Sequence, residues 1–131
     1  MDMKLELVPV PVTDVDRAKA FYADQVGFVL DVDVRLADGV RFVQLTPPGS
    51  ACSIAIGTGL PGISDMPPGT QKALHLVVPD IDRARDELIG RGVAVGDVQD
   101  VGDGVKYAWF TDPDGNSLAL QEMGWRTGEN F

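Results

Sequence analysis

The feature that most constrains this chain is a repeat with an offset of 66 residues. Residues 46–50 read T-P-P-G-S, and residues 112–116 read D-P-D-G-N. The same offset relates residues 14–18 (D-V-D-R-A) to residues 80–84 (D-I-D-R-A). Because two separate segments match at one offset without a gap, the chain is predicted to be a tandem duplication, with one fold assembled from two similar units.

Both proline-containing segments predict the tip of a β-hairpin. In each, Pro at the second position restricts φ, and Gly at the fourth supplies a positive-φ position. Alternating apolar runs precede and follow both tips. Four strands are therefore predicted to pair around these two turns.

The two D-x-D pairs, Asp14/Asp16 and Asp80/Asp82, predict helix starts. Acidic residues cap the free N–H groups of a first turn and interact favourably with the helix dipole. Capping explains the pairs better than paired catalytic carboxylates do, because both pairs stand at matching positions before an apolar stripe.

Each half is predicted to be β-α-β-β-β, which places the chain in the α+β class. The first half has strands at 5–12, 28–35, 40–45 and 51–56, and a helix from Thr13 or Asp14 to Gly27. The second has strands at 73–78, 93–98, 105–111 and 117–121, and a helix from 79–80 to Gly90 whose apolar stripe is Ala84, Leu88 and Ile89. We expect one domain, with module one at about 4–57, a Gly/Pro-rich linker at 58–71, module two at about 72–123 and a tail at 124–131.

Composition narrows the functional classes. The chain has 131 residues, a net charge of −9 and a single cysteine, Cys52. No disulfide can form within the chain, and a reducing cytoplasm is the expected location. Nucleic-acid binding is not expected because no Lys/Arg cluster is present, and no apolar run is long enough to predict a membrane span.

The two modules, the D-x-D-R-A helix start and the F-T-D-P-D-G-N tip resemble the vicinal-oxygen-chelate superfamily over about residues 5–122. This group includes glyoxalase I, extradiol dioxygenases and bleomycin-resistance proteins. The resemblance implies that the paired modules form a half-open, eight-stranded β-cup with helices outside and a small-molecule ligand inside. It also implies a homodimer.

Strand alternation predicts which side chains line this cup. Val8, Val10 and Val12 should face a helix, as should Leu74, Leu76 and Val78. In the last hairpin, Trp109 should pair with Ala119 and Tyr107 with Gln121; in the first half, Leu45 should pair with Ala51, Val43 with Ser53 and Arg41 with Ala55. The predicted lining is Pro9, Arg41, Val43, His75, Val77, Tyr107, Trp109 and Gln121.

The resemblance also implies where a metal would be bound. In metal-binding members, the first and last strands of each module contribute one ligand apiece. The corresponding positions here are Leu7, Ser53, Ala73 and Ala119. These side chains cannot hold a divalent metal well, so no metal or other cofactor is expected; a weak site from His75 and Gln121 is the alternative.

The sequence leaves three functions open. The first is a metal-independent binding protein for an aromatic or cationic molecule, held against Trp109 and Tyr107. The second is a metal-independent isomerase or lyase in which His75, the single histidine, carries protons. The third is a glyoxalase-type metalloenzyme. Trp109 and Tyr107 could instead fill the cup as core, and Arg41 could pair with a ligand carboxylate or with an acid such as Asp38.

Overall fold

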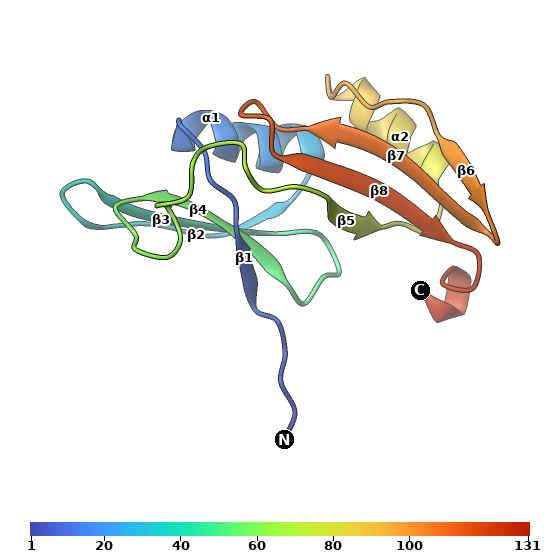
Figure 1. Ribbon diagram of the computed structural model, residues 1–131, viewed down its shortest axis with the longest axis horizontal. Helices are drawn as coiled ribbons and strands as arrows, with labels where there is room; N and C mark the ends of the chain where they lie inside the picture. The colour runs from blue at the N-terminus through green and yellow to red at the C-terminus, as the bar shows by residue number, and fades with distance from the viewer. The chain divides into compact units, whose positions relative to one another are not determined.

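The computed structural model describes residues 1–131, which divide into two compact units. Unit 1 comprises Met1–Gln71 and Asp112–Asn116; unit 2 comprises Lys72–Thr111 and Ser117–Phe131. Each unit contains one four-stranded sheet and one main helical segment (Figure 1). The predicted α+β class and the two tandem β-α-β-β-β modules are confirmed.

The sheet of unit 1 has the strand order β1-β4-β3-β2. The β1–β4 pair is parallel, and the other pairs are antiparallel. The elements in chain order are β1 (Leu7–Pro9), α1 (Val15–Ala20), the π-helical continuation η1 (Phe21–Val26), β2 (Val29–Ala37), β3 (Val40–Thr46) and β4 (Ser53–Thr58).

The first helix begins and ends where the sequence predicts. The Asp14 carboxylate accepts a hydrogen bond from the backbone N–H of Arg17 at 3.1 Å, which makes it the N-cap. The helical segment ends at Gly27, whose φ of 94° suits a residue without a side chain. The face of the sheet that carries Val43 and Ile56 is buried, and α1 packs against β4.

The sheet of unit 2 repeats this arrangement in the order β5-β8-β7-β6. The β5–β8 pair is parallel and the remaining pairs are antiparallel. The elements are β5 (Leu74–Val77), α2 (Ile81–Gly90), β6 (Gln99–Gly102), β7 (Val105–Thr111), β8 (Ser117–Met123) and a single 3-10 turn, η2 (Gly128–Asn130).

Two details of the second module differ from the prediction. Residues 93–98 do not form a strand; Val93 and Val95 are buried in an irregular segment, and the strand is β6. The stripe of α2 consists of Ile81 and Leu88, while Ile89 is 43% exposed. Seven residues are almost two full helical turns, so Ile81 and Leu88 share a face from which Ile89 is rotated by about 100°.

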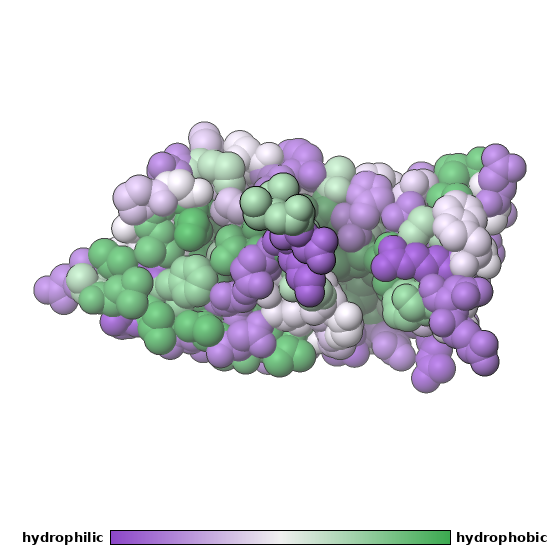
Figure 2. Space-filling model, turned by 90° about the horizontal axis from the view of Figure 1, so that it is seen from below, coloured by the Kyte–Doolittle hydropathy of each residue, from purple (hydrophilic) through white to green (hydrophobic).

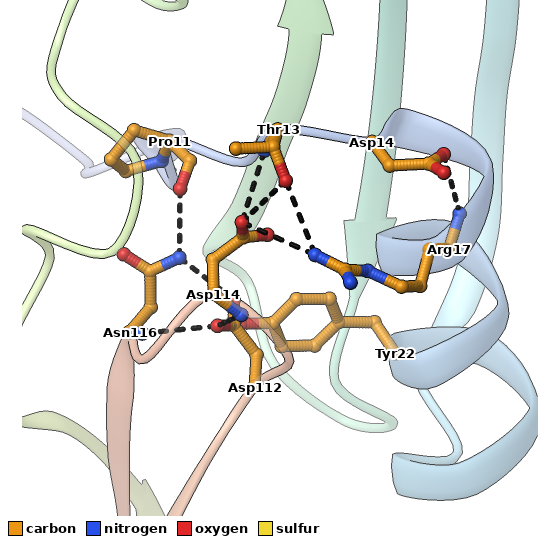
Figure 3. A network of polar contacts seen from close by, with 8 residues as sticks. All are labelled: Pro11, Thr13, Asp14, Arg17, Tyr22, Asp112, Asp114 and Asn116. Carbon is orange, nitrogen blue, oxygen red and sulfur yellow. Dashed lines mark hydrogen bonds and ion pairs between the residues drawn. The ribbon is translucent and has the colours of Figure 1, made fainter.

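The second hairpin tip belongs to unit 1 and is held there by a polar network (Figure 3). The buried Asp112 carboxylate accepts hydrogen bonds from the Tyr22 hydroxyl and the Asn116 side chain, both at 2.8 Å. Its other oxygen accepts the backbone N–H groups of Asp114 and Asn116. Burial, followed by the charge of Asp112, raises the pKa of the Tyr22 hydroxyl above its usual value.

Three further hydrogen bonds join this tip to the segment before α1 and to α1 itself. The Asn116 amide donates to the carbonyl of Pro11 at 2.8 Å. Asp114 accepts hydrogen bonds from the Thr13 hydroxyl at 2.6 Å and from Arg17 at 3.3 Å (Figure 3). The D-P-D-G-N motif therefore has a structural role, since its polar side chains anchor the tip to the start of the first helix.

Candidate functional site

The hairpin β3–β4 has a different register from the one that alternation predicted. Leu45 pairs with Ile54, Val43 with Ile56 and Arg41 with Thr58. The predicted pairing was wrong by three positions because the whole segment 47–52, rather than a short tip, connects the two strands. A shift by an odd number of residues exchanges the two faces of a strand relative to its partner.

This shift moves Val43 and Arg41 away from the predicted ligand face. Val43 is fully buried on the helix-covered side of the first sheet, and Arg41 is only 7% exposed on the same side. The predicted face of these two residues is therefore wrong. Their environment is set by α1 and by the neighbouring strand β2.

Arg41 is the centre of an ion-pair network. Its guanidinium donates to Asp33 at 3.0 and 2.9 Å and to Asp16 of α1 at 2.7 Å. Lys19 also reaches Asp33, at 2.7 Å. Hydrogen bonds from Arg41 and Lys19 hold the pKa of Asp33 well below its usual range, and the Asp33 and Asp16 carboxylates raise the pKa of Arg41. The expected acid partner, Asp38, is not the one used.

The other face of the first sheet carries a hydrogen-bonded row of polar side chains, the polar relay of Gln44, Ser53, Thr46 and Asp31. Gln44 donates to the Ser53 hydroxyl at 3.1 Å, and the Ser53 and Thr46 hydroxyls are 2.6 Å apart. Thr46 donates to the Asp31 carboxylate. Because Thr46 has one hydroxyl hydrogen, Ser53 must be the donor toward Thr46.

The polar relay shares its face with apolar residues. Pro9 and Ala55 lie in one row with Gln44, while Leu7 lies in the next row with Ser53 and Thr46. Seen from the side away from α1, the sheet of unit 1 shows apolar areas interrupted by polar residues (Figure 2). Val29 and Val34 of the edge strand β2 are 53% and 40% exposed. Sequence reasoning missed the relay because the register error had placed Gln44 and Thr46 on the helix side.

In unit 2 the predicted register of the last hairpin is confirmed. Tyr107 pairs with Gln121 and Trp109 with Ala119. On the other side of β8, His75 pairs with Ala119. These residues share one face of the second sheet, while the opposite face, which includes Leu118, Leu120, Ala108 and Phe110, is buried.

Three of these side chains form a ring cluster, defined as His75, Tyr107 and Trp109. The imidazole lies edge-on to the other two rings, at centroid distances of 5.6 Å from Tyr107 and 5.8 Å from Trp109. Tyr107 and Trp109 are stacked at 6.3 Å. Trp109 is 38% exposed and His75 is exposed, so the rings present an accessible aromatic surface rather than a filled core.

The pairing of the first and last strands revises one position of the family metal site. Leu7 pairs with Ser53, but the residue that pairs with Ala119 is His75 and not Ala73. Ala73 precedes β5 and has a positive φ of 62°. The geometric counterpart of Leu7 is therefore His75. The 66-residue offset relates Leu7 to Ala73, so the first strand of module two is displaced by two residues from that offset.

The donor set at these positions does not fit a divalent metal. Leu7 and Ala119 have no donor atom, Ser53 offers one hydroxyl that is already hydrogen-bonded, and His75 offers one imidazole. Catalytic zinc sites use three protein ligands drawn from His, Cys, Asp and Glu. The chain contains no group of three such residues arranged to hold a metal ion.

Comparison with known families places the chain. Residues 4–120 match the Glyoxalase/Bleomycin resistance protein/Dioxygenase superfamily. The protein therefore belongs to this superfamily. The match spans both modules, from just before β1 into β8.

Two solved structures from Streptomyces sp. CB03234 are similar over most of their length. TnmS3, described as an antibiotic binding protein, is 34% identical with a TM-score of 0.80, covering 93% of this chain and 97% of its own. A glyoxalase/bleomycin resistance protein is 37% identical with a TM-score of 0.76, covering 89% and 98%.

A curated relative is more distant. The Mycobacterium tuberculosis protein named "Putative glyoxylase CFP32" is 26% identical over 128 residues, which is 92% of this chain and 46% of that protein. The chain thus spans about half the length of the curated relatives that it matches. None of its own helices is long and apolar enough to cross a membrane.

Proposed function

We propose that the protein is a metal-independent binding protein for a small aromatic molecule, which stacks on the ring cluster of unit 2. The observation that carries this proposal is the exposure of Trp109 beside His75 and Tyr107 on a face that α2 does not cover. Three rings on one accessible sheet face provide a platform for a planar ligand. The similarity to a protein described as antibiotic-binding supports the same reading.

A cationic aromatic ligand would gain an additional attraction. The indole face of Trp109 attracts a cation placed above it, and the net charge of −9 favours the approach of a positive ligand. Aromatic stacking supplies the larger part of the binding, since a solvent-exposed cation–π contact contributes only about 0.5–1 kcal/mol. A flat cation should therefore bind better than a flat anion, and a non-aromatic cation should bind poorly.

Isothermal titration calorimetry with three probes tests the proposal. Proflavine is a flat aromatic cation, 2-naphthoate a flat anion and choline a non-aromatic cation. We expect saturable binding of proflavine that Trp109→Ala weakens and Trp125→Ala leaves unchanged, because Trp125 lies outside the cluster in the tail and is 62% exposed. Equal binding of proflavine to both variants would refute a site on the ring cluster.

Metal independence is tested separately. Protein dialysed against EDTA should bind proflavine with the same affinity as protein dialysed against Zn²⁺ or Ni²⁺. Elemental analysis should find less than one metal ion per ten chains. A stoichiometric metal, or binding that requires one, would favour the glyoxalase-type metalloenzyme instead.

His75 favours a metal-independent isomerase or lyase as the second candidate. Its Nδ1 is hydrogen-bonded to the carbonyl of Ala73 at 2.7 Å, an arrangement that orients the ring for proton transfer through Nε2. In that case His75→Ala would abolish turnover of a bound substrate while Trp109→Ala would mainly raise KM. A binding protein would show no turnover in either form.

We also propose that the protein forms a homodimer, as the family resemblance implies. The edge strand β2 is nine residues long and exposes Leu30, Val34 and Leu36 by 40–65%. Long apolar edge strands are usually covered in native proteins. Multi-angle light scattering should give twice the mass of one chain, and a monomeric mass at micromolar concentration would refute the dimer.

A further inference from the structure

The hydrogen bond at His75 determines which ring nitrogen carries the proton. Nδ1 lies 2.7 Å from the backbone carbonyl oxygen of Ala73. A carbonyl oxygen can only accept, so Nδ1 must be the donor. In the neutral imidazole, Nε2 is then unprotonated and presents a lone pair. No hydrogen-bond partner within the chain occupies Nε2, so this acceptor is open on the exposed sheet face.

The Ala73 carbonyl is held in position by two features. Ala73 has a φ of 62°, a conformation uncommon for a residue with a side chain. Its backbone N–H donates to the Ser117 hydroxyl of β8 at 2.8 Å. Such backbone strain persists only where the surroundings enforce it, and it occurs often at binding sites. Here its effect is to aim the Ala73 carbonyl at the His75 ring.

Tyr107 supplies a hydrogen-bond donor beside the His75 acceptor. Its hydroxyl oxygen accepts a hydrogen bond from the Gln121 amide at 3.1 Å. The hydroxyl hydrogen is not used in this bond and remains available as a donor. The ring cluster thus offers one open acceptor, at His75, beside one open donor, at Tyr107, with their rings 5.6 Å apart.

We propose that the ring cluster selects aromatic ligands that carry a ring hydroxyl, with His75 Nε2 accepting the hydrogen bond of that hydroxyl. The Tyr107 hydroxyl can donate to an oxygen of the same ligand. This inference rests on the proposed binding function and specifies the ligand as a phenol-type molecule. An ether or carboxylate oxygen has no hydrogen to donate to His75 Nε2. A ligand that placed such an oxygen beside Nε2 would remove water from this nitrogen and leave it without a hydrogen bond.

The tautomer can be measured without any ligand. His75 is the only histidine of the chain, so a long-range ¹H–¹⁵N correlation spectrum shows one imidazole. At pH 8 we expect Nδ1 to be the protonated nitrogen in the wild type. In Ser117→Ala, where the Ala73 backbone loses its support, the spectrum should shift toward a mixture of tautomers. A dominant Nε2–H tautomer in the wild type would overturn the inference.

Ligand selection is tested with a matched probe pair, 2-naphthol and 2-methoxynaphthalene. Both have the same ring system, but the methyl ether has no hydrogen to donate. We expect the wild type to bind 2-naphthol roughly fivefold more tightly, the typical effect of one hydrogen bond. His75→Phe preserves a ring at this position but removes the acceptor, so the preference should disappear while both probes still bind.

The outcomes separate the two proposals. If the wild type binds both probes equally, the hydroxyl selection is wrong and the aromatic-binding function stands. If neither probe binds, the binding function itself fails, and the inference fails with it. A preference for 2-naphthol that persists in His75→Phe would assign the selection to another residue and so overturn the role of His75. Circular dichroism of each variant checks that the exposed substitution leaves the fold intact.

Discussion

The two modules share their topology. They differ in the residues on the sheet face that the helix does not cover. In unit 1 the paired positions are Leu7 and Ser53, and Ser53 belongs to the polar relay, in which every hydroxyl is hydrogen-bonded. In unit 2 the paired positions are His75 and Ala119, beside the exposed rings of Trp109 and Tyr107. The hydroxyls of the first face are hydrogen-bonded within the chain, whereas the second face leaves aromatic surface and the His75 Nε2 acceptor open.

We propose that this difference reflects a specialisation of the two copies. Both hydroxyl hydrogens of the polar relay are already used, so a ligand that accepts a hydrogen bond from either hydroxyl must replace an existing one. Exposed aromatic rings gain directly when a ligand removes them from water. We therefore propose that the second sheet provides the ligand affinity, and the following substitutions test that proposal.

The largest loss of stability is expected from a substitution on the helix-covered side of the first sheet. This side buries the charged Arg41, whereas the corresponding side of the second sheet buries only apolar residues. Arg41→Ala leaves Asp33 without its main partner and should lower the free energy of unfolding by about 3 kcal/mol. Urea denaturation measures this change. The exposed neighbour Arg35 is the matched control, and Arg35→Ala should change stability by less than about 0.5 kcal/mol.

The next largest effect concerns the face of the second sheet that α2 does not cover. Trp109→Ala removes a stacking surface and should weaken proflavine binding by about tenfold, equivalent to about 1.4 kcal/mol. Calorimetry gives the affinity, and thermal unfolding should show little change because Trp109 is 38% exposed. Unchanged affinity would place the ligand elsewhere in the chain.

A smaller effect is expected from breaking the polar relay. Thr46→Val preserves the shape of the side chain but removes the hydroxyl between Ser53 and Asp31. The buried Ser53 loses an acceptor, so we expect a loss of about 1 kcal/mol in the free energy of unfolding. Proflavine affinity should stay the same. A loss of affinity with unchanged stability would make the first sheet a ligand surface and reverse the comparison.

The smallest effect is a pH dependence of stability. The pKa of Asp33 is held below its ordinary value of 3.8 by Arg41 and Lys19, so its ion pairs stabilise the fold fully above about pH 5. This contribution should decline as the pH falls through 4 toward the pKa of the folded state. Asp33→Asn removes the titrating group, so the wild type and the variant should converge in stability between pH 5 and pH 2. Parallel curves would contradict the assignment.

The prediction of which side chains face the ligand depended on the register of the two hairpins. The tip at 112–116 is closed by the Asp112 carboxylate, which accepts the backbone N–H groups of Asp114 and Asn116. Counting from this tip therefore placed Trp109, Tyr107 and Gln121 on one face correctly. The tip at 46–50 is followed by further unpaired residues, and counting from it placed Arg41 and Val43 on the wrong face. Local turn chemistry predicts that a hairpin exists, but the length of its connection sets the register.

The sequence alone determined the duplication, the order of elements, both helix caps and the superfamily, because each follows from residues that are close together in the chain or from an exact offset. Only the tertiary structure decided that Arg41 is buried in an ion-pair network, that His75 rather than Ala73 stands opposite Ala119, and that the Ala73 carbonyl orients the imidazole. These features depend on the pairing of strands that are distant in sequence. A slip of one residue in such a pairing exchanges the faces, and periodicity alone does not specify it.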